Sequence, residues 1–240
     1  MKRHSIQNDE TIATVIVADE FVPLASQAVF EAREQLIGYI IENPEFEGSL
    51  NPLYVSKGAP PLVQKMAEAG QAVGVGPMAA VAGAIAEYVV AKLLAAGAQH
   101  VVFDNGGDVA MYLQAPIIAG IYAGPNGVDG IGLKITRTNE ILGLCTSSGT
   151  VGHSLSFGCS DAALTFSRNV ALADAAATAL GNSVTARDSD LIASAMRNVM
   201  VQDIEGAMVI IGDAIGTCGR LPDIVCAQVD YNLISKGLEV

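Results

Sequence analysis

The stretch from Gly76 to Ala96 places the strongest constraint on the fold of this chain. It opens on Gly76-Pro77, where a proline suits the first turn of a helix, and it is followed by Gly97, a common helix terminator. Large apolar side chains form one face of this helix, and alanine and glycine form much of the rest. A helix that is apolar nearly all round has no face suited to water, so we predict that it is buried in the core.

The other elements are mainly strands, and their order shows no regular alternation of strand, helix and strand. Runs of strands with a few long helices inserted are typical of the α+β class, so we predict largely antiparallel sheets with long helices packed against them in one domain over residues 1–240. The predicted strands are 11–18, 100–104, 109–113, 116–123, 130–136, 140–146, 162–167, 207–212, 214–217 and 223–229, and the other helices are 25–42, 60–69 and 188–200.

The charge of the chain excludes two classes of partner. Its 25 acidic and 13 basic residues give a formal net charge of −12. Nucleic acids and anionic membrane surfaces are bound through basic patches, so we expect neither as a partner. A phosphate ligand stays compatible with this charge if a divalent cation accompanies it. Polar residues follow Lys2-Arg3-His4, and the apolar run 72–86 is short and interrupted by glycine and proline, so we expect a cytoplasmic protein without a membrane span.

Chemically useful side chains are concentrated between Leu144 and Asn182. The run Thr146-Ser147-Ser148-Gly149 combines hydroxyl groups with small residues, a composition that can hold phosphate oxygens and that also occurs in ordinary turns. His153 lies between two glycines and could accept a proton near neutral pH, although a lone histidine is more often structural.

Asp174 and Thr178 lie further along the same stretch, in an alanine-rich segment. Residues four apart lie on one face of a helix, one turn from each other. Carboxylate and hydroxyl oxygens are ligands suited to Mg²⁺. The alternative is that Asp174 lies in the first turn of its helix and interacts with the helix dipole without any metal.

The run Asn105-Gly106-Gly107-Asp108 follows a predicted strand and precedes another. Asn-Gly between two strands is a strong signal for a tight hairpin. The functional alternative is that the two glycines let a ligand lie on the backbone while Asn105 or Asp108 hydrogen bonds to it.

In their order along the chain, these motifs resemble those of the ApbE flavin transferases and, more closely, of the cytoplasmic ApbE-like proteins of archaea and bacteria. Such glycine-rich motifs are weak singly, but several in the same order are more specific. The matching motifs are Gly76-Pro77-Met78-Ala79-Ala80-Val81-Ala82-Gly83, Asn105-Gly106-Gly107-Asp108, Thr146-Ser147-Ser148-Gly149, Gly152-His153-Ser154-Leu155 and Ala173-Asp174-Ala175-Ala176-Ala177-Thr178-Ala179-Leu180.

The resemblance implies an α+β, T-fold-like architecture and Mg²⁺-dependent chemistry on FAD, whose FMN half passes to a serine or threonine of an acceptor redox protein. It implies that Asp174 and Thr178 bind the metal and that His153 activates the accepting hydroxyl. It also implies that the runs Asn105-Gly106-Gly107-Asp108 and Thr146-Ser147-Ser148-Gly149 line the flavin nucleotide. Water as the acceptor would make the protein an FAD pyrophosphatase, and the sequence leaves open whether the chain forms a homo-oligomer.

Two departures from the family pattern support an alternative function. The enzymes carry a Lys-Gly pair in the long helix, whereas this chain has Ala82-Gly83 there. They also show a stretch ending Asp-Pro-x-Thr-Gly after the histidine, whereas this chain has Ser154-Leu155-Ser156-Phe157-Gly158. The alternative is therefore a non-catalytic flavin-binding or nucleotide-binding module.

Overall fold

A large antiparallel sheet forms the centre of the molecule in the computed structural model, which describes residues 2–124, 127–150 and 157–228. Its eight strands lie in the order β1-β2-β3-β4-β7-β8-β9-β10, and every neighbouring pair is antiparallel. A second antiparallel sheet has the order β11-β6-β5. The predicted α+β class with largely antiparallel sheets is confirmed. The strands are β1 (Lys2–Asn8), β2 (Thr11–Val17), β3 (Val101–Asn105), β4 (Asp108–Tyr112), β5 (Ile117–Gly120), β6 (Ile131–Ile135), β7 (Leu142–Ser147), β8 (Ala162–Ser167), β9 (Ile204–Ile211), β10 (Ala214–Gly219) and β11 (Asp223–Cys226).

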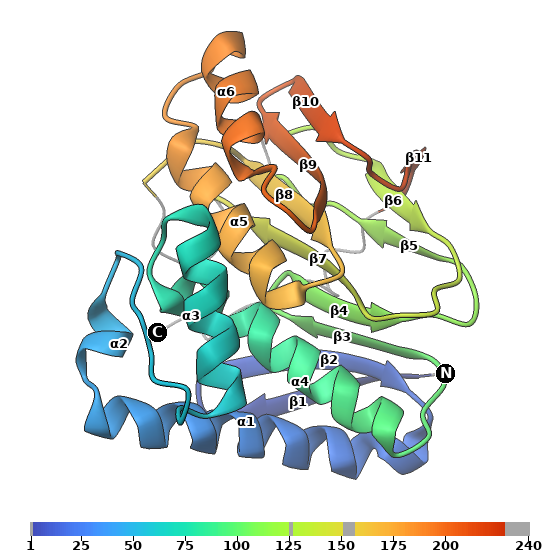
Figure 1. Ribbon diagram of the computed structural model, residues 1–240. Coiled ribbons are helices and arrows are strands. Elements are labelled where there is room, and N and C mark those ends of the chain that lie inside the picture. Colours follow the sequence, from blue (N-terminus) through green and yellow to red (C-terminus); the bar gives the residue numbers. More distant parts are fainter. Residues whose placement is uncertain (1, 125–126, 151–156, 229–240) are drawn as a thin grey trace.

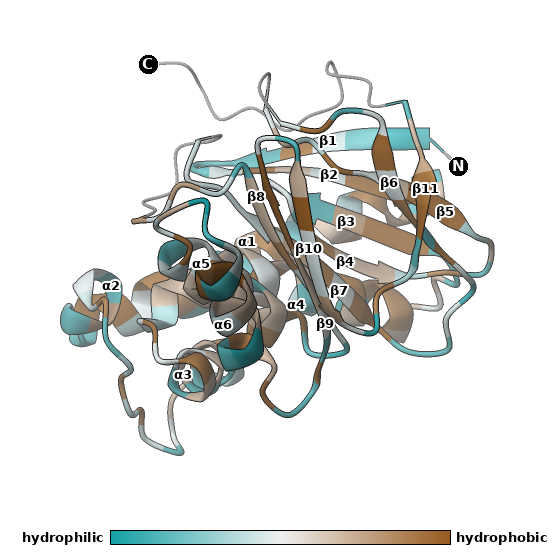
Figure 2. Ribbon diagram, turned by 90° about the horizontal axis from the view of Figure 1, so that it is seen from above, coloured by the Kyte–Doolittle hydropathy of each residue, from teal (hydrophilic) through white to brown (hydrophobic). Residues whose placement is uncertain are grey.

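The helices cover one face of the large sheet, and the small sheet lies on the other side (Figures 1 and 2). Helix α4 packs against β3 and β4, α5 against β7 and β8, and α6 against β9 and β10. Helix α1 lies along β1 and β2, and α3 packs on α5 in an outer layer. The helices are η1 (Asp19–Phe21), α1 (Val22–Glu42), α2 (Glu45–Gly48), α3 (Pro61–Val73), η2 (Pro77–Ala80), α4 (Val81–Ala95), α5 (Val170–Ser183) and α6 (Ser189–Val199).

Two hydrophobic clusters fill the spaces on either side of the large sheet. In β3, Val101 and Phe103 belong to the cluster beneath the helices, whereas Val102 belongs to the cluster beneath the small sheet. Successive side chains of a strand point to opposite faces, which explains this division. All six residues of β8 are buried because both of its faces are covered.

Helix α4 is the buried helix that the sequence predicts. It follows the 3-10 turn η2, and Gly97, with a φ of +100°, lies just beyond its C-terminus. Among the described residues, Pro77–Ala95 is the one helical stretch long and apolar enough to cross a membrane, by length and composition only. Half of that stretch is buried inside the fold, where it packs on α1, α5 and the sheet, as the core helix of a globular protein does.

The structure differs from the prediction at the N-terminus and in one loop. Strand β1 was not predicted because its sequence is polar, and Ile6 is its one buried residue. It forms as an edge strand paired with β2, so its hydrogen-bonding partner rather than its own pattern places it in the sheet. Residues 45–59, which lie between the predicted helices 25–42 and 60–69, begin with the short helix α2, whose Phe46 is buried and contacts Tyr39 edge-on.

Candidate functional site

The segment from Asn105 to Asp108 is a two-residue hairpin turn between β3 and β4. Gly106 and Gly107 have φ values of +71° and +104°, the left-handed conformation that such turns require of both central residues. The Gly107 amide donates to Asp104 Oδ1 at 3.0 Å, which fastens the turn. The hairpin interpretation of this motif is confirmed.

This hairpin also brings two polar side chains under the helices. Asn105 and Asp108 are paired across the strands, so their side chains share one face of the sheet. Asn105 Nδ2 donates to the carbonyl oxygen of Ala82 in the first turn of α4, at 3.2 Å. The turn therefore places the Asp108 side chain between the sheet and the start of α4.

Strand β7 places part of the hydroxyl-rich run beside this hairpin. Asp108 pairs with Cys145, and the backbone amide of the next residue, Thr146, lies close enough to oppose the rise in the pKa of the Asp108 carboxyl that burial causes. Gly149 lies apart from this pair, because its amide donates to the carbonyl of Ser160 at 2.9 Å. Of the predicted run, the structure thus brings Thr146 next to Asp108, with Ser147 following it in the strand, whereas Ser148 and Gly149 belong to the loop beyond.

Asp174 is buried at the start of α4 rather than at the end of its own helix. Helix α5 begins at Val170, so Asp174 is not in its first turn, and the expected interaction with that helix end is wrong. Asp174 Oδ2 instead accepts a hydrogen bond from the Gly83 amide at 2.7 Å. No side chain caps α4 at Ala80, so Asp174 stabilises the N-terminus of α4 from a distant part of the chain.

Two carboxyl groups with raised pKa values meet at this place. Burial raises the pKa of Asp174 to about 7, against the opposing effect of the amides of Gly83 and Ala82. Burial, and next to it the negative charge of Asp174, raises the pKa of Asp108 well above its ordinary value. In the part of the chain that the structure describes, no basic side chain forms an ion pair with either group. The site therefore disfavours two negative charges unless a cation joins them.

The remaining predicted residues are Thr178 and His153. Thr178 is half-buried, one turn beyond Asp174 on α5. His153 lies outside the described residues. On either side of its segment, the Thr150 hydroxyl donates to Asp161 Oδ1 at 2.9 Å and the Phe157 amide donates to Asn182 Oδ1 at 2.9 Å.

Glu87 is a residue of this region that the sequence analysis missed. It lies in the apolar helix α4, and its Oε2 atom accepts hydrogen bonds from the Val170 amide at 3.1 Å and the Ala171 amide at 3.5 Å, while Lys65 pairs with Oε1. Glu87 thus stabilises the N-terminus of α5 as Asp174 stabilises that of α4. The available signal was an acidic residue in an otherwise apolar helix, which indicates a specific partner.

Replacing Glu87 with alanine is expected to lower the free energy of unfolding by about 1–2 kcal/mol, because the first amides of α5 then lose a charged cap. Urea denaturation of the two proteins measures the difference. Glu68→Ala is the matched control, since Glu68 is exposed on α3 and the same change there removes no cap. Equal midpoints for the two variants would contradict the capping role.

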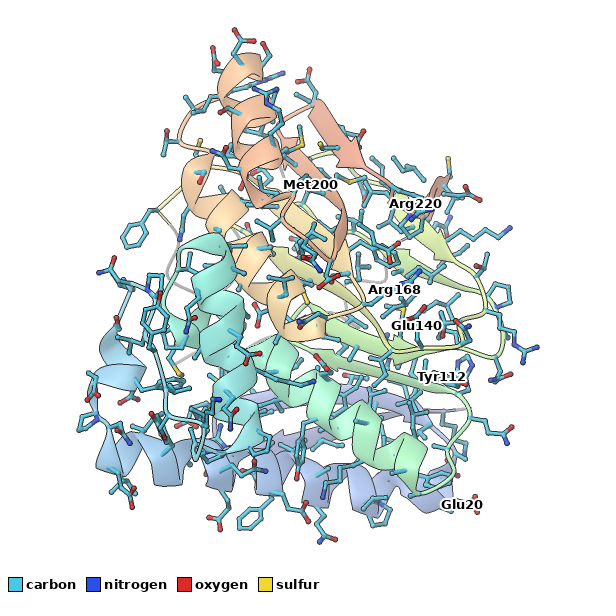
Figure 3. All side chains as sticks on the ribbon, viewed as in Figure 1. Glu20, Tyr112, Glu140, Arg168, Met200 and Arg220 are labelled. Carbon is cyan, nitrogen blue, oxygen red and sulfur yellow. The ribbon has the colours of Figure 1, made fainter. Side chains whose placement is uncertain are left out.

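A groove of about 380 Å³ lies elsewhere, between the edge of the small sheet and the end of β8. Figure 3 shows Arg168 and Glu140 side by side there, and Arg168 also pairs with Glu205 at 2.8 Å. None of the residues that the sequence singled out lines this groove. The converging carboxyl groups near α4, rather than this groove, therefore define the candidate site.

Three comparisons with known proteins, by family model, by sequence and by structure, agree with one another. The family model described as AbpE bacteria matches residues 3–213. A UPF0280 protein of Methanocella arvoryzae is 46% identical over 98% of this chain and 96% of its own length, and one of Archaeoglobus fulgidus is 37% identical over 99% of this chain and 100% of its own. The fold is similar to that of the apo flavinyl transferase ApbE of Pseudomonas stutzeri, with a TM-score of 0.51 and 12% identity over 99% of this chain and 97% of that one. The flavin transferase ApbE of Vibrio cholerae gives a TM-score of 0.50 and 12% identity over 90% of this chain and 96% of that one.

Proposed function

Because the chain belongs to the ApbE-like family described as AbpE bacteria, we propose that it binds a flavin nucleotide together with Mg²⁺ in the cytoplasm and transfers FMN from FAD to a serine or threonine of an acceptor protein. The solved proteins of similar fold are named as flavin transferases. At their low identity the likeness concerns the fold, so the argument for the activity depends on this chain's own residues.

One observation supports the proposal: the buried carboxyl group of Asp174 and the partly buried carboxyl group of Asp108, whose Oδ1 atom is shielded from solvent, interact, with no basic side chain paired to either among the described residues. Charged groups so placed are stabilised by a cation. Mg²⁺ is commonly held by one or two carboxylates and takes its other ligands from water and phosphate groups. The donor set at the start of α4 fits that pattern, with Asp174 and Thr178 as the residues that would hold the ion.

The other residues would orient the substrate and move a proton. A bound Mg²⁺ would offset the negative charge of the pyrophosphate. The glycine turn at Gly106-Gly107 and the hydroxyls of Thr146 and Ser147 would lie along the nucleotide. His153 would take the proton from the hydroxyl of the acceptor, or from water if the reaction is hydrolysis.

The second candidate function is flavin binding without transfer. It is favoured by the start of α4, where the family enzymes carry a Lys-Gly pair and this chain has Ala82-Gly83. The Gly83 amide is held by Asp174, and a Cβ at Gly83 would lie 2.6 Å from the carbonyl oxygen of Val170. Neither Ala82 nor Gly83 supplies the lysine ammonium that the family enzymes have in this helix, and this favours binding without transfer.

Calorimetric titration of the purified protein with FAD tests the proposal. We expect FAD to bind in the presence of Mg²⁺ and to bind at least about tenfold more weakly in EDTA. Without the cation, the negative charge of the pyrophosphate is repelled by the acidic side chains of the site. Asp174→Asn should reproduce the EDTA result in the presence of Mg²⁺. Asp190→Asn is the control, since it removes an exposed carboxylate from the first turn of α6.

Three outcomes of that titration, combined with an assay of AMP release, are decisive. Equal FAD affinity with Mg²⁺ and with EDTA would refute the metal dependence and leave Asp174 as the cap of α4. The protein is also incubated with FAD, Mg²⁺ and several threonine-containing acceptors, and chromatography measures the AMP released. Mg²⁺-dependent binding together with AMP release supports the transferase. Binding without any AMP release supports the non-catalytic module.

A further inference from the structure

Asp108 has a carboxylate oxygen that is buried and has no hydrogen-bond partner. Its Oδ1 atom is shielded from solvent, and no donor in the described structure reaches it. The carboxylate is contacted by the Cys145 thiol and by the backbone amide of Thr146. Buried polar atoms in proteins nearly always have a partner, so an oxygen left over next to a candidate site indicates a ligand.

The charges around Asp108 specify what kind of ligand suits it. Asp174 and, more weakly, Asp104 oppose its ionisation, and no basic side chain among the described residues pairs with it. An anionic phosphate oxygen would be repelled by these groups. A cation between Asp108 and Asp174 would instead be attracted to both.

The number of ligands available indicates the class of cation. In residues 2–124, 127–150 and 157–228, no three side chains of His, Cys, Asp or Glu gather in a metal-binding group. A structural Zn²⁺ site requires about four nitrogen or sulfur ligands, which are not gathered here. A hard divalent ion that shares two carboxylates with water and phosphate oxygens fits the two acids.

We propose that Asp108 is a second carboxylate ligand of the divalent cation, alongside Asp174. This inference rests on the proposed function, because the cation is the one that accompanies the nucleotide. It changes the role of Asp108 from a nucleotide contact, which the sequence predicts, to a metal ligand. Asn105, which shares its face of the hairpin, is bonded to the Ala82 carbonyl and holds the turn against α4.

Binding of Mn²⁺ to the nucleotide-free protein tests the role of Asp108 without using catalysis. Mn²⁺ has the same preference for carboxylate oxygen and its free form is counted by electron paramagnetic resonance. We expect Asp108→Asn to weaken Mn²⁺ binding about 10–100-fold, the loss found when groups that support a metal site are removed. Asp108→Ser is a second variant with the same expected loss, and circular dichroism in EDTA checks that both are folded.

Asp104→Asn is the matched control. Asp104 lies on the same hairpin but alternates with Asn105 along β3, so it faces the other side of the sheet. An asparagine there still accepts the hydrogen bond from the Gly107 amide while it removes the same charge. Because Asp104 acts on Asp108 only weakly and through charge, the Mn²⁺ affinity of Asp104→Asn should change far less than that of Asp108→Asn.

The results separate this inference from the proposed function. Wild-type affinity for Mn²⁺ in folded Asp108→Asn overturns the inference, and so does an equal loss in Asp104→Asn, which would reflect net charge alone. Either result leaves Mg²⁺-dependent FAD binding by the unmodified protein, and with it the proposed function, intact. Failure of the unmodified protein to bind Mn²⁺ with or without FAD overturns both.

Discussion

Replacing His153 with alanine is expected to lower the rate of AMP release from FAD by about 10²–10⁴-fold, the usual cost of removing a positioned base. The affinity for FAD should change little, because His153 is proposed to act on the acceptor hydroxyl rather than on the nucleotide. Single-turnover assays with Mg²⁺ and an acceptor give the rate, and calorimetry gives the affinity. The expected result is a lower single-turnover rate constant with a nearly unchanged dissociation constant for FAD.

His4→Gln is the control for this experiment. His4 lies on the edge strand β1, where its ring contacts Asp19 at 3.1 Å, and it is not among the residues of the candidate site. Its variant should release AMP at the unmodified rate. An unaltered rate in His153→Ala would assign the base to another group, and absence of AMP release from the unmodified protein with every acceptor would select the non-catalytic module.

Gly83→Ala is expected to lower the free energy of unfolding by about 1–3 kcal/mol, the usual cost of adding a methyl group to a filled space. A Cβ at this position would lie 2.6 Å from the Val170 carbonyl oxygen and 2.7 Å from Asp174 Cβ. Helices α4 and α5 would have to separate, and Asp174 would lose its hydrogen bond to the Gly83 amide. Urea denaturation and Mg²⁺-dependent FAD binding should both show the effect.

Gly38→Ala provides a matched control for Gly83→Ala. Both glycines lie within helices, but a Cβ at Gly38 would meet no atom within 4 Å. Alanine has the higher helix propensity, so Gly38→Ala should raise the free energy of unfolding by up to about 1 kcal/mol. Equal effects of the two substitutions would show that α4 and α5 tolerate the added methyl group, contrary to the close packing observed.

Features of the fold that depend on residues close together along the chain were predictable from the sequence. The burial of α4 follows from a helix that is apolar on all sides, and the hairpin at Gly106-Gly107 follows from two residues that accept positive φ. Strand β8 has its predicted bounds, 162–167, because a short and mostly apolar run suits a strand buried on both faces. The polar strand β1 could not be found in this way, since its pairing with β2 decides its conformation.

The site was predictable in its residues but not in its contacts. Asp174 and Asp108 were both singled out, Asp174 as a metal ligand or as a residue in the first turn of its own helix, and Asp108 as a contact to the nucleotide. Their meeting at the first turn of α4, and the cap that Glu87 provides for α5, could not be read from either motif.

The sequence by itself determined which segments are buried, where the chain turns and which side chains can carry the chemistry, because these depend on residue type and on periods of a few residues. The tertiary structure alone decided which of those side chains meet. Asp174 reaches the Gly83 amide across 91 residues, and it does so because α4 and α5 pack side by side over one face of the large sheet. No local sequence pattern predicts that contact, because it depends on the order of the strands in the sheet, which places the two helices side by side.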